Sequence, residues 1–504
     1  MTSPNPTQKG SDPAVGSRPG LILAFLCVGQ FMVFLDLSIV NLALPSIQDS
    51  LGMSDVSLNY IVTAYATVLG GFLLLGGRLA DTFGRRRVLQ IGYLIFAAAS
   101  LVSGFATNGT MLIIARSSQG LGAALMAPAA LSILTNTFAE GAPRNKALGI
   151  WGSLTGLASI VGVILGGVLS DGPGWEWIFW INVPIGVGAA ALASRIIPES
   201  KAYERRRSFD VAGATTLTAG MLLLIFTLGE ATHVGWATAR TIGSLAGVAV
   251  LLAIFILIEL RASAPLVPLR IFRLKTMRTA NLTAVLIWGT VVALFFFVSL
   301  FMQQVWGYSP MRTGFAYIPL ALAVVAGAGI ASAMITRLAA RPVLIAGMVV
   351  MIAGLLLLWR APVDGSYAVD LLPAFLLVGL GCGLIFVTLQ IAAFVGLSDE
   401  EAGLGAGLIN TSQEAGGALG LAVIATIAYT GMAAKLAEAG GDAALIREAQ
   451  EAANNRAFLA AACFATGALL LAVVMMPRGR APKHAAGTRE VSRSAAEGKA
   501  GLTG

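Results

Sequence analysis

Apolar segments long enough to cross a lipid bilayer recur along almost the whole chain, and they leave few architectures open to it. A membrane-spanning helix needs about 20 mostly apolar residues. About fourteen such segments lie near residues 21–44, 57–77, 88–106, 111–136, 147–170, 176–195, 211–229, 241–260, 279–303, 313–336, 342–360, 370–397, 403–430 and 456–477. Because backbone polar groups in the hydrocarbon core must be hydrogen-bonded within the protein, we expect each segment to be an α-helix.

The composition agrees with an all-α integral membrane protein embedded in a lipid bilayer. Of the 504 residues, 57% are hydrophobic and only 12% are charged, about half the charged fraction of a soluble domain. The net charge is +8, but the basic residues form short clusters between apolar segments rather than one face. We therefore expect no nucleic-acid partner.

Positive charges between the segments predict the orientation of the chain. Most of the 33 Lys and Arg residues lie in alternate connecting segments and near the two ends. Those on the other side are Arg240, Arg312, Arg360, Lys435, Arg447 and Arg456. Since cytoplasmic loops are enriched in Lys and Arg, we predict a multi-pass protein of the cell (inner or plasma) membrane with both ends in the cytoplasm.

Three stretches are expected to lie outside the spans. Residues 1–20 are polar and rich in Pro, Gly and Ser, and residues 478–504 are basic and rich in small residues; both are predicted to be disordered cytoplasmic tails. Residues 433–455 have helical periodicity broken by two glycines and are predicted to be an outside loop carrying a surface helix.

One acidic residue, Asp36, lies deep in the first apolar segment, within the stretch FLDLSIVNLALP. A carboxylate at membrane depth costs about 2.5–3.5 kcal/mol on insertion scales, and such residues usually face a cavity, a partner or a proton path. Ser38 and Asn41 follow at helical spacing, on or near the same face. The alternative is a structural carboxylate held by a neighbouring helix.

Arg116, in the first third of the fourth segment, is the natural partner of Asp36, directly or through water and Gln119. A guanidinium stays protonated at such a site and must find a carboxylate, carbonyls or water. The guanidinium favours the ionised form of Asp36, whereas burial favours the protonated form. This opposition is what a proton carrier needs, although a purely structural charge pair would have the same composition.

The segment GGRLADTFGRRRVL, residues 76–89, predicts a tight turn between the second and third spans. Gly77 and Gly84 permit close helix approach and unusual backbone angles. Asp81 can pair with an arginine or cap a neighbouring helix, and Arg85 and Arg86 hold the turn at the cytoplasmic face. Such a cluster is either a switch that locks two half-bundles together or a plain topology-setting loop.

Glu414 is a second acidic residue at membrane depth. It either holds a proton or a cationic substrate, or it lies near a water-filled surface or is packed by Asn410 and Gln413. A substrate path should combine apolar and aromatic surface with few polar groups. The candidates, any one of which could instead be core or lipid-facing, are Ser38, Asn41, Tyr60, Gln119, Trp288, Phe297, Gln390, Asn410 and Gln413. No phosphate-binding loop, nucleophile–base pair or metal-ligand cluster is present in the sequence, so we expect no catalytic site, no metal and no cofactor.

These motifs resemble a known family in the same order along the chain. GGRLADTFGRRR is similar to the signature loop of the major facilitator superfamily, and FLDLSIVNLALP resembles the first-span motif of its fourteen-span drug:proton antiporter branch. RSSQGLGAALMAPAAL, GLASIVGVILGG, WEWIFWINVPIG and GLGAGLINTSQEAGGALG resemble the motifs of spans four, five, six and thirteen. The resemblance implies the major facilitator fold, in which two six-helix bundles are joined here by two additional helices.

The resemblance also implies roles for residues and boundaries for domains. Arg116 matches an arginine implicated in proton coupling, and the antiporter helix carries Gly156, Gly162, Gly166 and Gly167, although Val163 stands where proline is usual. The expected division is 1–20 (tail), 21–195 (N-terminal six-helix bundle), 196–262 (two linker helices), 263–477 (C-terminal six-helix bundle) and 478–504 (tail).

The expected function is proton-coupled export of small hydrophobic or cationic compounds by alternating access, performed by a monomer, with protons as the coupling ion and no enzymatic activity. A proton-coupled importer of a small metabolite would have the same fold. The resemblance of span five to the antiporter motif argues against an importer, but less strongly because Val163 replaces the usual proline. From a different class, a membrane sensor or scaffold that transports nothing is the other alternative.

Overall fold

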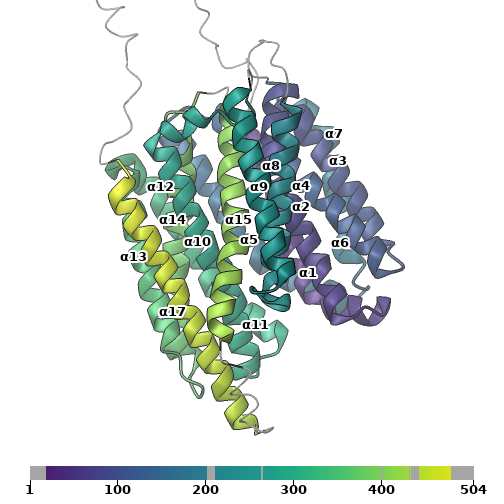
Figure 1. The fold of residues 1–504 in the computed structure, drawn as a ribbon, viewed down its shortest axis with the longest axis vertical. Helices are drawn as coiled ribbons and strands as arrows, with labels where there is room; N and C mark the ends of the chain where they lie inside the picture. Colours follow the sequence, from purple (N-terminus) through teal and green to yellow (C-terminus); the bar gives the residue numbers. More distant parts are fainter. Residues whose placement is uncertain are drawn as a thin grey trace, which may run out of the picture.

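The chain forms a bundle of long helices that run side by side (Figure 1). The computed structural model describes residues 19–200, 210–262, 265–398, 401–430, 432 and 442–477, and no β-strand occurs among them. Several helices begin where the sequence offers a capping side chain. Asn108 accepts from the Met111 N–H at 2.9 Å, and Asp210 accepts from the Gly213 N–H at 2.8 Å, which satisfies donors left free at a helix start.

Residues 19–196 form seven helical elements. They are α1 (Pro19–Leu51), α2 (Asp55–Phe83), α3 (Arg85–Gly104), α4 (Gly109–Thr137), α5 (Ala142–Asp171), α6 (Trp177–Trp180) and α7 (Asn182–Ile196). Helix α4 packs against both α2 and α3, while α1 packs against α5 and α3 against α7. Nearly all of α4 after Gln119 is buried, so its polar side chains must find partners inside the protein.

Two further helices, α8 (Val211–Val234) and α9 (Ala239–Arg261), follow. Helix α8 packs against α2, α15 and α9, whereas α9 packs mainly against α8. The other faces of α9 carry exposed apolar side chains, among them Ile242, Val250 and Ile254. This is the surface that a helix at the edge of a membrane protein presents to lipid.

The remaining helices are α10 (Lys275–Leu300), α11 (Pro310–Ala316), α12 (Ile318–Leu338), α13 (Ala340–Trp359), α14 (Leu372–Phe394), α15 (Ala402–Tyr429) and α17 (Ala443–Met475). A 3₁₀ turn η1 (Leu269–Arg273) precedes α10, and the π-helical turns η2 (Phe301–Val305) and η3 (Tyr367–Leu371) extend α10 and lead into α14. Helix α10 packs against α15 and α17, and α14 packs against α12 and α13.

The helices from α1 to α7 form an N-terminal group, and those from α10 to α17 form a C-terminal group. The two groups meet through small residues. Helix α2 packs against α15, and α5 packs against α12 and α14. A Cβ atom on Gly77 would lie 2.4 Å from the carbonyl oxygen of Gly403, and one on Gly149 would lie 2.9 Å from the Ser332 Cβ. Because no side chain larger than hydrogen fits at these points, the backbones approach closely there.

Twelve helices of the described residues are long and apolar enough to cross a membrane. Helices α5 and α15, with 30 and 28 residues, are not among the twelve, and in α15 polar residues such as Asn410, Gln413 and Glu414 lower the hydropathy. The number of fourteen spans therefore stays a prediction.

One local prediction was wrong. Residues 443–455 are not part of a separate surface helix, because they form the first turns of α17. Asp442 caps this helix by accepting from the Ala444 N–H at 2.8 Å. The rest of the predicted loop, 433–441, lies outside the described residues.

Candidate functional site

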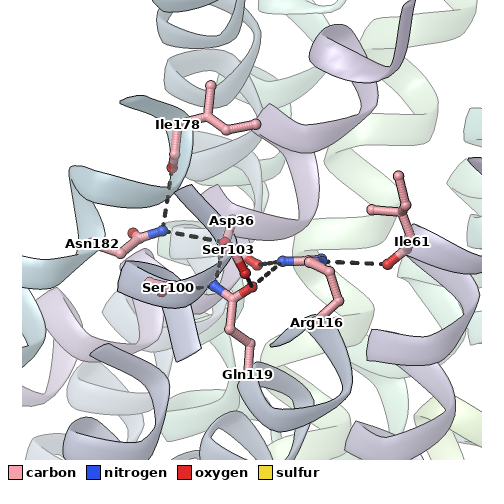
Figure 2. Close-up of polar contacts among 8 residues, drawn as sticks. All are labelled: Asp36, Ile61, Ser100, Ser103, Arg116, Gln119, Ile178 and Asn182. Carbon is pink, nitrogen blue, oxygen red and sulfur yellow. Dashed lines mark hydrogen bonds and ion pairs between the residues drawn. The ribbon is translucent and has the colours of Figure 1, made fainter. Parts of the chain in front are cut away.

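Asp36 and Arg116 form an ion pair in the interior of the N-terminal group of helices (Figure 2). Nη1 of Arg116, on α4, lies 2.5 Å from Oδ2 of Asp36, on α1. The side chains are 0% and 1% exposed, so neither reaches solvent in this conformation. A carboxylate and a guanidinium removed from water in this way depend strongly on each other, and loss of one partner typically costs about 3–5 kcal/mol.

Two amides complete the surroundings of the carboxylate. Gln119 Nε2 and Asn182 Nδ2 each donate to Oδ1 of Asp36 at 3.2 Å. Gln119 is itself fixed by two serines of α3, since its Nε2 donates to Ser100 Oγ at 2.7 Å and its Oε1 accepts from Ser103 Oγ at 3.3 Å. The carboxylate of α1 is therefore bound by side chains of α4 and α7, and α3 joins the network through Gln119 (Figure 2).

Arg116 has further partners besides Asp36. Its Nη1 also donates to Gln119 Oε1 at 2.9 Å, and its Nε donates to the Ile61 carbonyl at 3.3 Å. The guanidinium carbon lies 4.3 Å from the ring centre of Tyr65 and 5.8 Å from that of Phe179. Aromatic faces attract a cation, so the site holds the guanidinium with one carboxylate, two neutral acceptors and two rings.

The predicted switch loop joins the two groups of helices. Asp81, near the end of α2, accepts from the backbone N–H groups of Gly403 and Leu404 at 3.2 and 3.0 Å. It also pairs with Arg85 at 3.0 Å. The first turn of a helix favours a negative charge, so the Asp81 carboxylate stabilises the contact with the start of α15.

The other residues of the loop are held by the segment after α7. Gly84 has φ +110° and separates α2 from α3, a conformation that L side chains rarely adopt. The Arg86 N–H donates to Glu199 Oε1 at 3.1 Å, and Arg86 Nη1 donates to the Ile197 carbonyl at 3.2 Å. The loop is thus tied on one side to α15 and on the other to residues 197–200.

The predicted antiporter helix α5 lies between the two groups. A Cβ on Gly162 would lie 2.6 Å from the Ser38 Cβ on α1, so Ser38 lies at the α1–α5 contact. Gly166 is buried. Gly156 and Gly167 lie within α5, and like the side chain of Asn41 their surroundings are outside the described part of the structure.

The substrate-cavity candidates do not come together in one place. Tyr60 donates to Glu230 Oε1 of α8 at 2.9 Å, and Phe297 is buried against Tyr429 with ring centres 5.8 Å apart. Gln119 belongs to the Asp36 network. Asn410 is half-buried on α15.

Three candidates lie on α10, α14 and α15, which pack against one another. The rings of Trp288 and Phe386 have their centres 4.5 Å apart. Oε1 of Gln390 and Nε2 of Gln413 are buried without a hydrogen-bond partner among the described residues. Glu414, next to Gln413, faces α2, since a Cβ on Gly70 would lie 3.2 Å from its Cβ.

Sequence reasoning paired Asp36 with Arg116 and placed Gln119 beside them, but it missed Ser100, Ser103 and Asn182. Asn182 is fully buried in WEWIFWINVPIG. An amide inside a motif of an apolar segment was the available signal. The sequence carries no comparable signal for Ser100 and Ser103, because small hydroxyl residues are common in membrane helices and do not mark a site.

Comparison with known proteins decides the family. The profile of the Major Facilitator Superfamily matches residues 26–421. The chain belongs to this superfamily. The puromycin resistance protein pur8 of Streptomyces alboniger is 35% identical over 456 residues, which is 90% of each chain. The cephamycin export protein CmcT of Amycolatopsis lactamdurans is 35% identical over 452 residues, 88% of this chain and 92% of that protein.

Solved structures agree on the major facilitator fold. The human organic anion transporter MFSD10 has a TM-score of 0.65 at 14% identity, covering 90% of this chain and 99% of that one. The proton:xylose symporter XylE has a TM-score of 0.63 at 13% identity, covering 91% and 96%. At such low identity the likeness concerns the fold alone. The predicted fold class is confirmed, and the protein is a multi-pass membrane transporter of this superfamily.

Proposed function

We propose that this major facilitator protein exports small hydrophobic or cationic compounds in exchange for protons, by alternating access. The observation that carries the proposal is the buried Asp36–Arg116 pair, an ionisable pair held at membrane depth by four helices. The named activities of the relatives support export, since they include puromycin resistance, cephamycin export and tetracenomycin C resistance and export.

The surroundings of Arg116 suggest how Asp36 gains and loses a proton. When Asp36 is protonated it no longer balances the guanidinium. Gln119 Oε1, the Ile61 carbonyl and the Tyr65 ring are already in contact with Arg116 and can hold it. Because Asp36 is inaccessible in this conformation, a proton reaches it only when the helices around it separate. Protonation is thereby coupled to rearrangement of the bundle.

The Asp81 contact supplies a latch for that rearrangement. In this conformation α2 and α15 are joined at the end of α2 where Asp81 meets the start of α15. Opening this end of the molecule breaks both hydrogen bonds and moves the backbones at Gly77 and Gly403, which are in close contact here, away from each other. The alternating states would then differ in whether this latch is formed.

The substrate would bind among α10, α14 and α15, on the side where Glu414 faces α2. Trp288 and Phe386 offer aromatic surface for an apolar or cationic compound. Gln390 Oε1 and Gln413 Nε2, which have no hydrogen-bond partner among the described residues, offer one acceptor and one donor, and Glu414 offers a carboxyl group. A pocket with much apolar surface and few polar groups suits hydrophobic compounds of varied structure.

The proposed setting is the cell membrane with both termini in the cytoplasm, as the distribution of Lys and Arg indicates. The protein would act as a monomer with protons as the only coupling ion. One proton crossing about 100 mV releases roughly 2.3 kcal/mol. At about 1.4 kcal/mol per tenfold, this supports a concentration gradient of about fifty-fold.

The proposal is tested with Asp36→Asn, which keeps the shape and removes the titratable group. In everted vesicles with an imposed proton gradient, we expect the parent to accumulate a fluorescent cationic drug and the variant to show no accumulation above passive entry. Asp49→Asn, an exposed position of the same helix, is the control and should transport normally. Gradient-driven accumulation by Asp36→Asn would remove this residue from the coupling mechanism, and uptake only in right-side-out vesicles would indicate an importer.

A further inference from the structure

An apolar groove of about 500 Å³ lies between α3 and α7, on the outer surface of the bundle. Its walls include Ile91 and Leu94 of α3 and Val187 and Ala191 of α7, and Arg87 lies at one end. Ile91, Leu94 and Val187 are each about half exposed. None of these residues takes part in the Asp36 network or in the contact between α2 and α15.

The two helices are antiparallel, and their contacts fix which residues lie at the same level. Gln90 Nε2 donates to the Ala190 carbonyl at 2.9 Å, and a Cβ on Gly186 would lie 2.9 Å from the Ala97 Cβ. The start of α3 therefore lies beside the end of α7. Between Arg87 and Leu94 the groove extends about 10 Å along α3, at 1.5 Å per residue.

A second cation lies at the end of the groove where Arg87 is found. Val187, Ala191 and Arg195 are spaced four residues apart on α7 and share one face of the helix. Arg195 lies in the last turn of α7 and is exposed. The groove thus has apolar walls along its length and two guanidinium groups at its mouth.

The charge at this mouth is not neutralised within the described residues. Glu199 is 3.6 Å from Arg86 and 3.7 Å from Arg87, and the Arg87 side chain remains 62% exposed. One carboxylate therefore faces two guanidiniums, and Arg195 adds a third positive charge nearby. A ligand that suits the mouth carries negative charge, and a ligand that suits the walls carries a hydrocarbon chain.

We propose that this groove binds an anionic glycerophospholipid. One acyl chain lies between α3 and α7 along Ile91 and Val187, and the phosphate lies between Arg87 and Arg195. A basic site between helices at a membrane surface is the arrangement that holds anionic headgroups. In the orientation proposed above this is the cytoplasmic leaflet, whose surface is negatively charged.

The experiment measures lipid bound to the intact protein by native mass spectrometry, after addition of phosphatidylglycerol or phosphatidylcholine of equal chain length. We expect phosphatidylglycerol to be retained preferentially, and each of Arg87→Gln and Arg195→Gln to weaken its binding about fivefold. Arg273→Gln, an exposed arginine on η1, is the matched control and should bind as the parent does.

A further variant tests the groove separately from the charges. Ala191→Phe fills the space between the walls at an exposed position, and it should reduce binding of both lipids while leaving the guanidiniums in place. Equal retention of the two lipids by the parent, an equal loss in Arg273→Gln, or unchanged binding in Ala191→Phe would each overturn the proposal. These readouts need no transport, so they are independent of the proposed drug export.

Discussion

At the scale of residues, the functional candidate is a small set of side chains whose charges and hydrogen bonds are mutually dependent. Asp36 accepts from Arg116, Gln119 and Asn182 and has no exposed surface. A buried charge without its partner is costly, whereas loss of both partners together costs much less. This difference separates the structural role of the pair from its proposed role in coupling.

The first prediction uses that difference. Arg116→Ala leaves Asp36 buried and unpaired, and we expect it to destabilise the protein by about 3–5 kcal/mol. The double variant Asp36→Asn/Arg116→Ala should recover most of the thermal stability in detergent but none of the proton-driven transport. Arg116→Lys should remain folded with partial transport, because an ammonium keeps the charge but not the planar geometry. Full transport by the double variant would show that the pair is only structural.

At the scale of elements, the hairpin of α8 and α9 is attached to the rest of the protein at both ends. At one end Tyr60 donates to Glu230, and Trp236 Nε1 donates to Thr426 Oγ1 at 2.6 Å. At the other end Glu259 accepts from the backbone N–H groups of Leu266 and Val267, in the segment after α9, at 3.0 and 3.2 Å. Arg78 of α2 donates to the Pro265 carbonyl of the same segment at 3.3 Å. The hairpin is therefore a fixed part of the bundle, and Glu259 anchors the chain that leads from it to α10.

The second prediction concerns this anchor. Glu259→Ala leaves two buried backbone N–H groups without an acceptor, at a cost of about 1–3 kcal/mol for each. We expect a clearly lower midpoint in thermal unfolding in detergent, with Glu259→Gln between this variant and the parent because its carbonyl can still accept. Glu448→Ala, an exposed position on α17, should unfold like the parent. A Glu259→Ala protein of full stability would show that the anchor contributes nothing.

At the scale of the whole molecule, closure between the two groups of helices depends on a few backbone contacts. Gly77 and Gly403 allow α2 and α15 to touch, and Asp81 binds the first turn of α15. These contacts all lie at one end of the helices. A change that weakens them should shift the molecule toward a state open at that end, because the equilibrium follows the difference in contact free energy.

The third prediction tests this shift by thiol labelling. In a Cys463→Ser background, Leu74→Cys places a thiol in α2 next to Gly407 of α15, where it is buried. Adding Asp81→Ala should raise its labelling rate at least tenfold, since loss of about 1.4 kcal/mol of closure changes the population tenfold. Glu140→Ala, which breaks an exposed pair with Arg144, should leave the rate unchanged. An unaltered rate in Asp81→Ala would mean that the contact does not hold the molecule closed.

The sequence alone determined the helical character of the chain, its membrane setting and its superfamily. Apolar runs of about 20 residues are a local property, and lipid leaves the backbone no alternative to the helix. The two unusual charges, Asp36 and Arg116, could also be paired from sequence, because few other ionisable groups lie at that depth.

Only the tertiary structure decided which side chains surround that pair and which backbones touch. Ser100, Ser103 and Asn182 become partners of the site because α3 and α7 pack against α1 and α4, and such contacts between distant segments leave no periodic trace in the sequence. The continuation of α17 into residues 443–455 and the binding of Asp81 to α15 have the same origin. They depend on how helices are arranged in space, which hydropathy does not encode.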